Sequence, residues 1–161
     1  MATKAKRAVE SRRKKEQVDE KEMPAVKRKP EDYLESFLRS IKQLTVALSR
    51  MSPDDATIWR VKERVISACD LFPVTVLQDV GAYLYKFRKQ IYDNDEKFFI
   101  DRAYDDELSK SEDSTKAESL KYLIPKIKEM WLKMNKIDRK ELMSQVAKLL
   151  DDYLEYTCSV N

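Results

Sequence analysis

The residues best suited to chemistry are two groups of cations near the N-terminus, Arg12-Arg13-Lys14-Lys15 and Lys27-Arg28-Lys29. Flexible cations of this kind release counterions from a phosphate backbone and bind it without reading its sequence. They dock equally well on an acidic protein surface or an import receptor, and the gap between the clusters has the spacing of a bipartite nuclear-import signal. A tail that only solubilises the chain is the third interpretation. The candidate binding cations are Lys4, Lys6, Arg7, Arg12, Arg13, Lys14, Lys15, Lys27, Arg28 and Lys29.

The sequence contains few of the residues and motifs that catalytic sites normally use. The chain has no His, which excludes Ser-His-Asp triads and His-ligated metals as they are normally built. Cys69 and Cys158 lie too far apart for a CxxC unit, and such sparse cysteine use indicates free thiols in a reducing compartment. With a single Gly there is no Gly-rich phosphate loop. We therefore expect no enzyme activity and no cofactor.

An acidic stretch at residues 93–115 invites a calcium interpretation, because hard cations prefer clustered carboxylates. An EF-hand loop that began at Asp93 would need an acidic residue or Asn at position 97, Gly at 98 and Glu at 104. The sequence has Lys97, Phe98 and Tyr104 there, so we expect a solvated connection and no metal site. The same stretch could receive the basic segment of another copy of the chain.

Charge divides the chain into two parts. Residues 1–29 hold 11 basic and 5 acidic side chains, whereas residues 30–161 hold 21 and 24. The first part has too few apolar residues to offset the entropy of ordering it. We therefore expect a flexible basic arm over residues 1–29 and one helical domain over residues 30–161.

The domain is predicted to be all-α, a bundle of about five helices. Gly and Pro are scarce, and apolar residues recur at three- and four-residue steps. Pro30 and Pro73 are placed to open helices. Ser52 is expected to cap the second helix, whose buried stripe ends at Phe72, and Asp55 stands at the capping-box position.

Two later boundaries are predicted from the same signals. Thr115 with Glu118 forms a capping box ahead of an apolar stripe, in which Pro125 is expected to kink or split the helix. Asp138 with Glu141 forms another box, flanked by Ile137 and Leu142 at the positions of a hydrophobic staple.

Two single residues stand out inside the helices. Gly81 adjoins an apolar seam and is expected to permit close approach of a neighbouring helix, which is a packing role. Trp59 lies off the main stripe of its helix and is the expected exposed anchor for a partner. The other aromatic residues are interpreted as core and rim packing, not as a platform for stacking bases.

Residues 92–101, YDNDEKFFID, and residues 124–134, IPKIKEMWLKM, resemble segments of small helical proteins from large nucleocytoplasmic DNA viruses. The resemblance covers about a third of the chain and carries no catalytic motif. It implies a viral protein that acts in an infected cell or is packed in the virion.

These observations predict a non-enzymatic interaction or assembly protein in the cytosol or nucleus, or in a virion. Its arm is expected to contact an acidic partner, and a protein partner or homo-oligomer is expected. The alternative is a sequence-independent nucleic-acid-binding protein that uses residues 1–29. An enzyme of unknown type is the third alternative. No apolar run reaches the roughly 20 residues that span a bilayer, so no membrane contact is expected.

Overall fold

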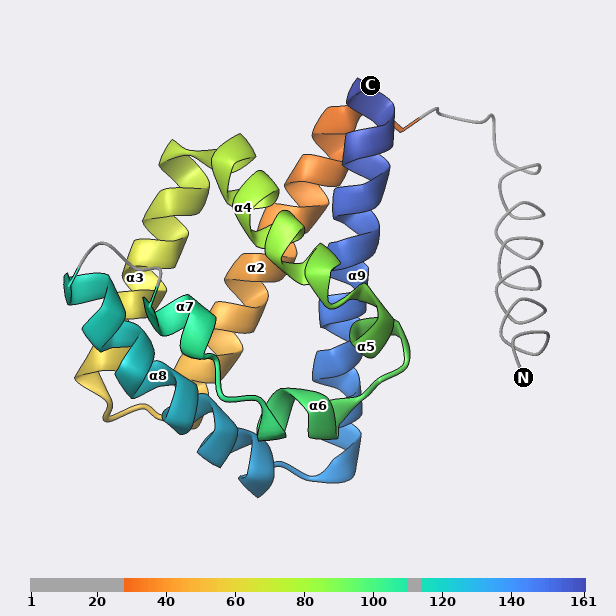
Figure 1. The fold of residues 1–161 in the computed structure, drawn as a ribbon. Coiled ribbons are helices and arrows are strands. Elements are labelled where there is room, and N and C mark those ends of the chain that lie inside the picture. The colour runs from red at the N-terminus through yellow and green to blue at the C-terminus, as the bar shows by residue number, and fades with distance from the viewer. Residues whose placement is uncertain (1–27, 110–113) are drawn as a thin grey trace.

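The computed structural model describes residues 28–109 and 114–161 of the chain. These residues form eight helices and no strand, which confirms the all-α prediction. Five of the helices have 14 residues or more, and three short ones lie between α4 and α8. The bounds, with the labels of Figure 1, are α2 Pro30–Met51, α3 Ala56–Leu71, α4 Pro73–Lys86, α5 Arg88–Tyr92, α6 Glu96–Asp101, α7 Asp105–Ser109, α8 Ser114–Lys133 and α9 Lys136–Val160.

The core lies where α2, α4 and α9 meet. Phe37 of α2, Leu77 of α4 and Leu149 of α9 are buried together, and half-buried apolar residues of the same helices surround them. Helices α2 and α9 run antiparallel (Figure 1), and the Ser36 hydroxyl of α2 donates to Asp152 of α9 at 2.7 Å. Burying a side chain the size of Phe37 contributes about 2–3 kcal/mol, so this three-helix contact stabilises the fold substantially.

Helix α3 packs on α2 and α4. Helix α8 begins beside α3 and runs along the lower side of the view in Figure 1 toward the start of α9. Two hydrogen bonds fasten α8 to the turn between α2 and α3. The Tyr122 hydroxyl donates to Asp55 at 2.5 Å, and the Ser52 hydroxyl contacts the sulfur of Met130 at 3.3 Å. Met130 is buried at this junction.

Close packing at Gly81 was predicted from the sequence and is found. The ring of Tyr153 in α9 lies directly against Gly81 in α4, where a Cβ atom would collide with it. The role of this glycine is therefore steric, because its backbone torsion is in the ordinary helical region.

The two helix starts predicted at proline residues are confirmed. Helix α2 begins at Pro30, with the Asp32 carboxylate accepting from the Lys29 amide at 2.9 Å, and α4 begins at Pro73. At both positions the missing amide hydrogen of proline costs nothing, because the first amides of a helix have no partner within it.

The predicted cap at Ser52 is wrong. Asp55 is the N-cap of α3, and its carboxylate accepts from the amides of Thr57 and Ile58 at 3.0 and 3.2 Å. Ser52 instead terminates α2. The Asp55 carboxylate can accept both free amides at once, so the helix begins three residues later than predicted.

The cap predicted at Asp138 is also wrong. Helix α9 starts at Lys136, and the Asn135 side chain accepts from the Asp138 amide at 2.8 Å. Ile137 is 78% exposed, so it forms no staple with Leu142. Asn is as good a capping residue as Asp, and here it stands three residues earlier.

The boundaries predicted for α8 differ as well. The helix includes Ser114, so Thr115 lies inside it and is not its cap. Pro125 does not split the helix, which runs unbroken to Lys133. Pro125 is exposed, so water can satisfy the carbonyl that loses its partner there.

Candidate interaction surfaces

The described residues include only two of the cations predicted to bind a partner. Arg28 and Lys29 are exposed immediately before α2, and the charge of Arg28 lowers the pKa of Asp152, although burial of that carboxyl has the larger, opposite effect. Lys4, Lys6, Arg7, Arg12, Arg13, Lys14, Lys15 and Lys27 lie outside the described residues. The role of the whole set stays a prediction.

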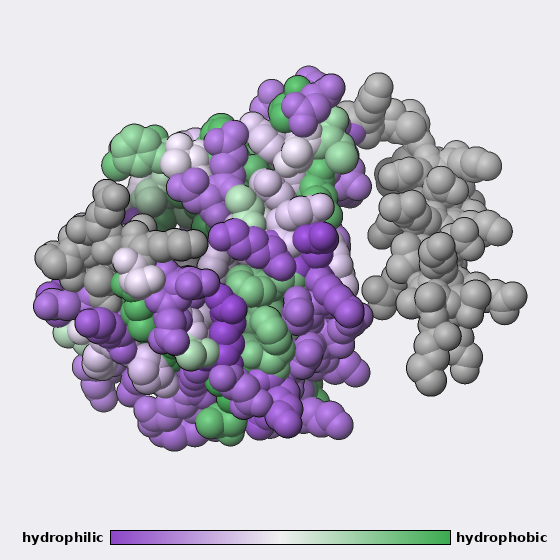
Figure 2. All heavy atoms as spheres, viewed as in Figure 1, coloured by the Kyte–Doolittle hydropathy of each residue, from purple (hydrophilic) through white to green (hydrophobic). Residues whose placement is uncertain are grey.

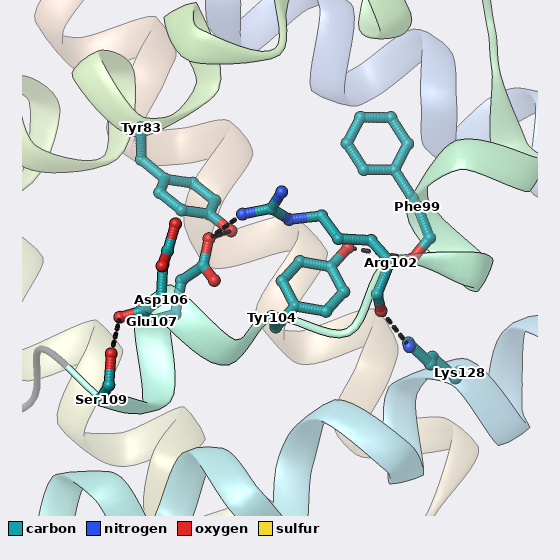
Figure 3. Close-up of polar contacts among 8 residues, drawn as sticks. All are labelled: Tyr83, Phe99, Arg102, Tyr104, Asp106, Glu107, Ser109 and Lys128. Carbon is teal, nitrogen blue, oxygen red and sulfur yellow. Dashed lines mark hydrogen bonds and ion pairs between the residues drawn. The ribbon is translucent and has the colours of Figure 1, made fainter.

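The predicted acidic connection folds into α6 and α7 and holds a polar cluster (Figure 3). Arg102, between the two helices, pairs with Glu107 of α7 at 2.7 Å. The same Glu107 oxygen accepts from the Tyr83 hydroxyl of α4 at 3.1 Å. Lys128 of α8 donates to the backbone carbonyl of Arg102 at 2.5 Å. The cluster therefore ties the connection to helices on both sides of it.

Aromatic rings lie beside Arg102 of this pair. The guanidinium of Arg102 lies 4.7 Å from the ring centre of Phe87 and 5.2 Å from that of Tyr104. Phe87 also contacts Phe98 and Phe99 of α6 at 5.9 and 6.0 Å between ring centres. Arg102 Nε and Glu107 Oε2 are buried without a hydrogen-bond partner among the described residues.

The protonation states of the cluster follow from these contacts. Burial raises the pKa of Tyr83 well above its ordinary value, and the neighbouring Glu107 raises it further. Burial also raises the pKa of Glu107, but hydrogen bonds from Arg102 and Tyr83 outweigh it and leave the pKa below the usual carboxyl value. The carboxylate stays charged and the phenol stays protonated at neutral pH. The cluster is therefore suited to holding the connection in place and not to transferring protons.

Apolar side chains are exposed where α3 meets α4. Leu71 is 70% exposed, Phe72 61% and Val74 38%. Figure 2 shows apolar residues gathered where Figure 1 places this corner. We call these three residues the α3–α4 corner. An open hollow adjoins it along α3, and Arg60, Glu63, Arg64, Ser67, Ala68, Leu71 and Phe72 line it.

Phe72 was predicted to lie on the buried stripe of its helix, and this was wrong. Helix α3 ends at Leu71, and Phe72 adopts φ −133° and ψ 58° ahead of Pro73. The residue before a proline is kept out of the helical region, so the chain bends between α3 and α4 by 117°. That bend turns the Phe72 side chain away from the core.

Trp59, the predicted partner anchor, lies on the outer side of α3 and is 38% exposed. Its indole nitrogen donates to the Pro53 carbonyl at 2.9 Å, and the Lys62 ammonium lies 3.4 Å from the ring centre. These contacts fix the ring, which lowers the entropy lost when a partner covers it. The anchor role itself stays a prediction.

Other potential sites were sought among residues 28–109 and 114–161. No group of three or more His, Cys, Asp or Glu side chains in this part of the chain is arranged to hold a metal ion. None of its helices alone is long and apolar enough to cross a bilayer, although the bent pair α3 and α4 together would meet that test of length and composition. Cys69 and Cys158 are both free.

Comparison with known proteins adds no relative: no protein-family model, no curated protein and no solved structure matches the chain.

Proposed function

We propose that this protein is a non-enzymatic interaction or assembly protein. Its helical domain presents the α3–α4 corner to a protein partner, and its basic segment, residues 1–29, contacts an acidic partner. The observation that carries the proposal is the corner, where Leu71 and Phe72 are adjacent in sequence and 70% and 61% exposed. Single exposed apolar residues are common, but adjoining large ones beside a hollow are typical of interaction sites.

The charge division supports the second half of the proposal. The excess of positive charge lies in residues 1–29, whereas residues 30–161 carry a small negative excess. The protein therefore offers two surfaces of different chemistry, one apolar and one basic. A role in the cytosol, the nucleus or a virion belongs to the same proposal.

Photo-crosslinking tests the role of the corner. A photoreactive phenylalanine analogue would replace Phe72, and in a matched control it would replace Tyr85, which is 42% exposed on α4. We expect crosslinks to protein from position 72 and none, or different ones, from position 85. Equal crosslinking from the two positions would show that the corner is ordinary surface.

The alternative, sequence-independent nucleic-acid binding, is favoured by the same basic clusters. Fluorescence anisotropy would compare duplex DNA and single-stranded RNA with the full chain and with a full-length variant carrying Arg12, Arg13, Lys14 and Lys15 as Gln. We expect negligible affinity at physiological salt for both proteins. Binding that weakens steeply with salt and disappears in the variant would establish the alternative.

A further inference from the structure

The turn between α8 and α9 exposes two large apolar side chains. Leu132, in the last turn of α8, is 62% exposed, and Ile137, the second residue of α9, is 78% exposed. Figure 1 places this turn at the lower end of the view and the α3–α4 corner at the upper end. The two apolar surfaces are therefore separate.

Neither side chain belongs to the buried side of its helix. A helix advances about 100° per residue, so Leu132 lies about 160° around α8 from the buried Met130. Ile137 lies about 120° around α9 from each of the buried residues Met143 and Leu149, on either side. Both side chains point away from the core, so a second phase can take them up without any change in the fold.

The same segment gathers the positive charge of the helical domain. Residues 121–141 hold seven basic and three acidic side chains, whereas the rest of residues 30–161 hold 14 basic and 21 acidic ones. Lys128 donates to the Arg102 carbonyl, and Lys133 pairs with Glu129 at 2.9 Å. The seven cations are Lys121, Lys126, Lys128, Lys133, Lys136, Arg139 and Lys140.

This combination of charge and apolar side chains favours one kind of partner. A phosphate backbone would attract the cations but would gain nothing from Leu132 and Ile137. Protein interfaces are enriched in Arg and depleted in Lys, whereas six of these seven cations are lysines. An anionic bilayer surface uses both features, because its headgroups attract lysine and its acyl chains accept aliphatic side chains. Trp131, half-buried in the same turn of α8, is of a type enriched at that boundary.

We propose that the α8–α9 turn binds the surface of an anionic lipid bilayer. Leu132 and Ile137 enter the boundary between headgroups and acyl chains, and the lysines lie against the phosphates with their stems along the apolar layer. The expectation of no membrane contact rested on the length needed to span a bilayer, and binding to its surface requires no such length. This inference goes beyond the proposed function and does not depend on it.

Vesicle co-sedimentation of the full chain tests the inference. Vesicles of phosphatidylcholine with about 30 mol% phosphatidylserine should bind the protein, and vesicles of phosphatidylcholine alone should bind it at least about tenfold more weakly. Residues 1–29 are also basic, so this result by itself does not locate the binding surface. The variants that follow locate it.

Apolar substitutions keep every charge and therefore separate the turn from residues 1–29. Leu132→Ser with Ile137→Ser should weaken binding to the anionic vesicles at least about tenfold, because two aliphatic side chains no longer leave water. The matched control is Leu71→Ser with Phe72→Ser at the α3–α4 corner, where the side chains are 70% and 61% exposed. That control should bind like the natural protein.

Charge substitutions test the lysines in the same way. Lys136→Gln with Lys140→Gln should weaken binding roughly fivefold for each cation removed from the membrane surface. Lys86→Gln with Lys89→Gln makes the same change in net charge at exposed positions of α4 and α5. This second pair should have a clearly smaller effect.

Fluorescence reports insertion at the turn directly. The chain has two tryptophans, so Trp131 is the only one in a Trp59→Phe variant. Brominated phosphatidylcholine in the anionic vesicles should quench Trp131 when the protein binds. The quenching should be lost when Leu132→Ser and Ile137→Ser are added.

Three results would overturn the inference: no binding to anionic vesicles at physiological salt, binding that the turn variants leave unchanged, or binding without quenching of Trp131. The second and third would assign lipid binding to residues 1–29. Nucleic-acid affinity that requires Lys136 and Lys140 but not Leu132 and Ile137, without vesicle binding, would make the turn a phosphate-backbone site instead. Crosslinking from position 72 is a separate readout, so the proposed function and this inference can fail independently.

Discussion

The contact between Gly81 and Tyr153 gives the sharpest test of the fold. In the substitution Gly81→Ala, the new Cβ atom would lie no farther than 2.7 Å from Cγ, Cδ2 and Cε2 of the Tyr153 ring. Carbon atoms in contact prefer about 3.5–4.0 Å, so the ring or one of the two helices must move by most of an ångström or more. Tyr153 packs against the buried cluster of Phe37, Leu77 and Leu149, which restricts that movement.

Two opposing effects set the magnitude. Ala in place of Gly in a helix interior contributes about 1 kcal/mol of stability when nothing opposes it. Overpacking a close-packed site costs about 1–3 kcal/mol, and the size of this overlap indicates the upper end of that range. We therefore expect Gly81→Ala to lower the free energy of unfolding by about 2 kcal/mol and Tm by about 4–8 °C.

Urea unfolding followed by far-UV circular dichroism measures the difference. Ala82→Gly, at the exposed neighbouring position in α4, is the matched control and should cost about 1 kcal/mol through helix propensity alone. In a Tyr153→Ala background the ring is gone, so Gly81→Ala should change sign and stabilise by about 1 kcal/mol. Stabilisation by Gly81→Ala in the natural sequence would refute the close approach of α4 and α9.

Three further substitutions or reactions report on other parts of the chain. Asn135→Ala should cost about 1 kcal/mol in urea unfolding and Asp138→Ala clearly less, because Asn135 caps α9; the reverse order would restore the cap predicted from the sequence. Burial raises the pKa of Asp152 more than the Ser36 hydroxyl lowers it. The folded state therefore holds this proton more tightly than the unfolded state, and stability falls as pH rises from the ordinary value of 3.8 through the raised pKa. Asp152→Asn should accordingly raise the urea midpoint at neutral pH and leave it unchanged near about pH 3; equal effects at both values would contradict this. A thiol reagent should modify exposed Cys158 quickly in the native protein and Cys69 only after unfolding, because Cys69 is 3% exposed and burial raises its pKa.

The sequence predicted those parts of the fold that depend on one residue's own geometry. Proline is suited to the first position of a helix, because its φ angle is already helical and it lacks the backbone N–H that would have no partner there. Pro30 and Pro73 begin α2 and α4 for this reason. Gly81 was assigned to packing for a similarly local reason, although its partner Tyr153 could not be named. A contact between helices separated by about seventy residues depends on the whole arrangement.

Capping residues were less predictable because the sequence offers several within a few positions. Ser52 and Asp55 both can cap α3, and Asn135 and Asp138 both can cap α9. The choice depends on which free amides each side chain reaches once the helix is docked. Ser, Asp and Asn differ little in their preference for the N-cap position, and packing of the helix against its neighbours outweighs that difference. The local pattern alone therefore misplaces the helix start by three residues.

The polar cluster at Arg102 could not be predicted at all. Its members come from α4, the α6–α7 connection and α8, and only Arg102 and Glu107 are close in sequence. An Arg and a Glu five residues apart in an acidic stretch look like solvated surface charges. They become a half-buried pair beside Phe87, which itself packs against Phe98 and Phe99, and no local pattern signals that meeting.

Phe72 shows how a one-residue boundary decides whether a side chain stabilises the fold or serves an interface. On a helix continued through position 72 it would extend the buried stripe, and truncation would cost about 3–5 kcal/mol. Because Pro73 excludes the helical conformation at Phe72, α3 stops at Leu71 and the ring turns outward. An exposed ring contributes little to folding, so its size has no structural reason within one copy of the chain. A partner that covers the α3–α4 corner, as proposed above, would supply that reason.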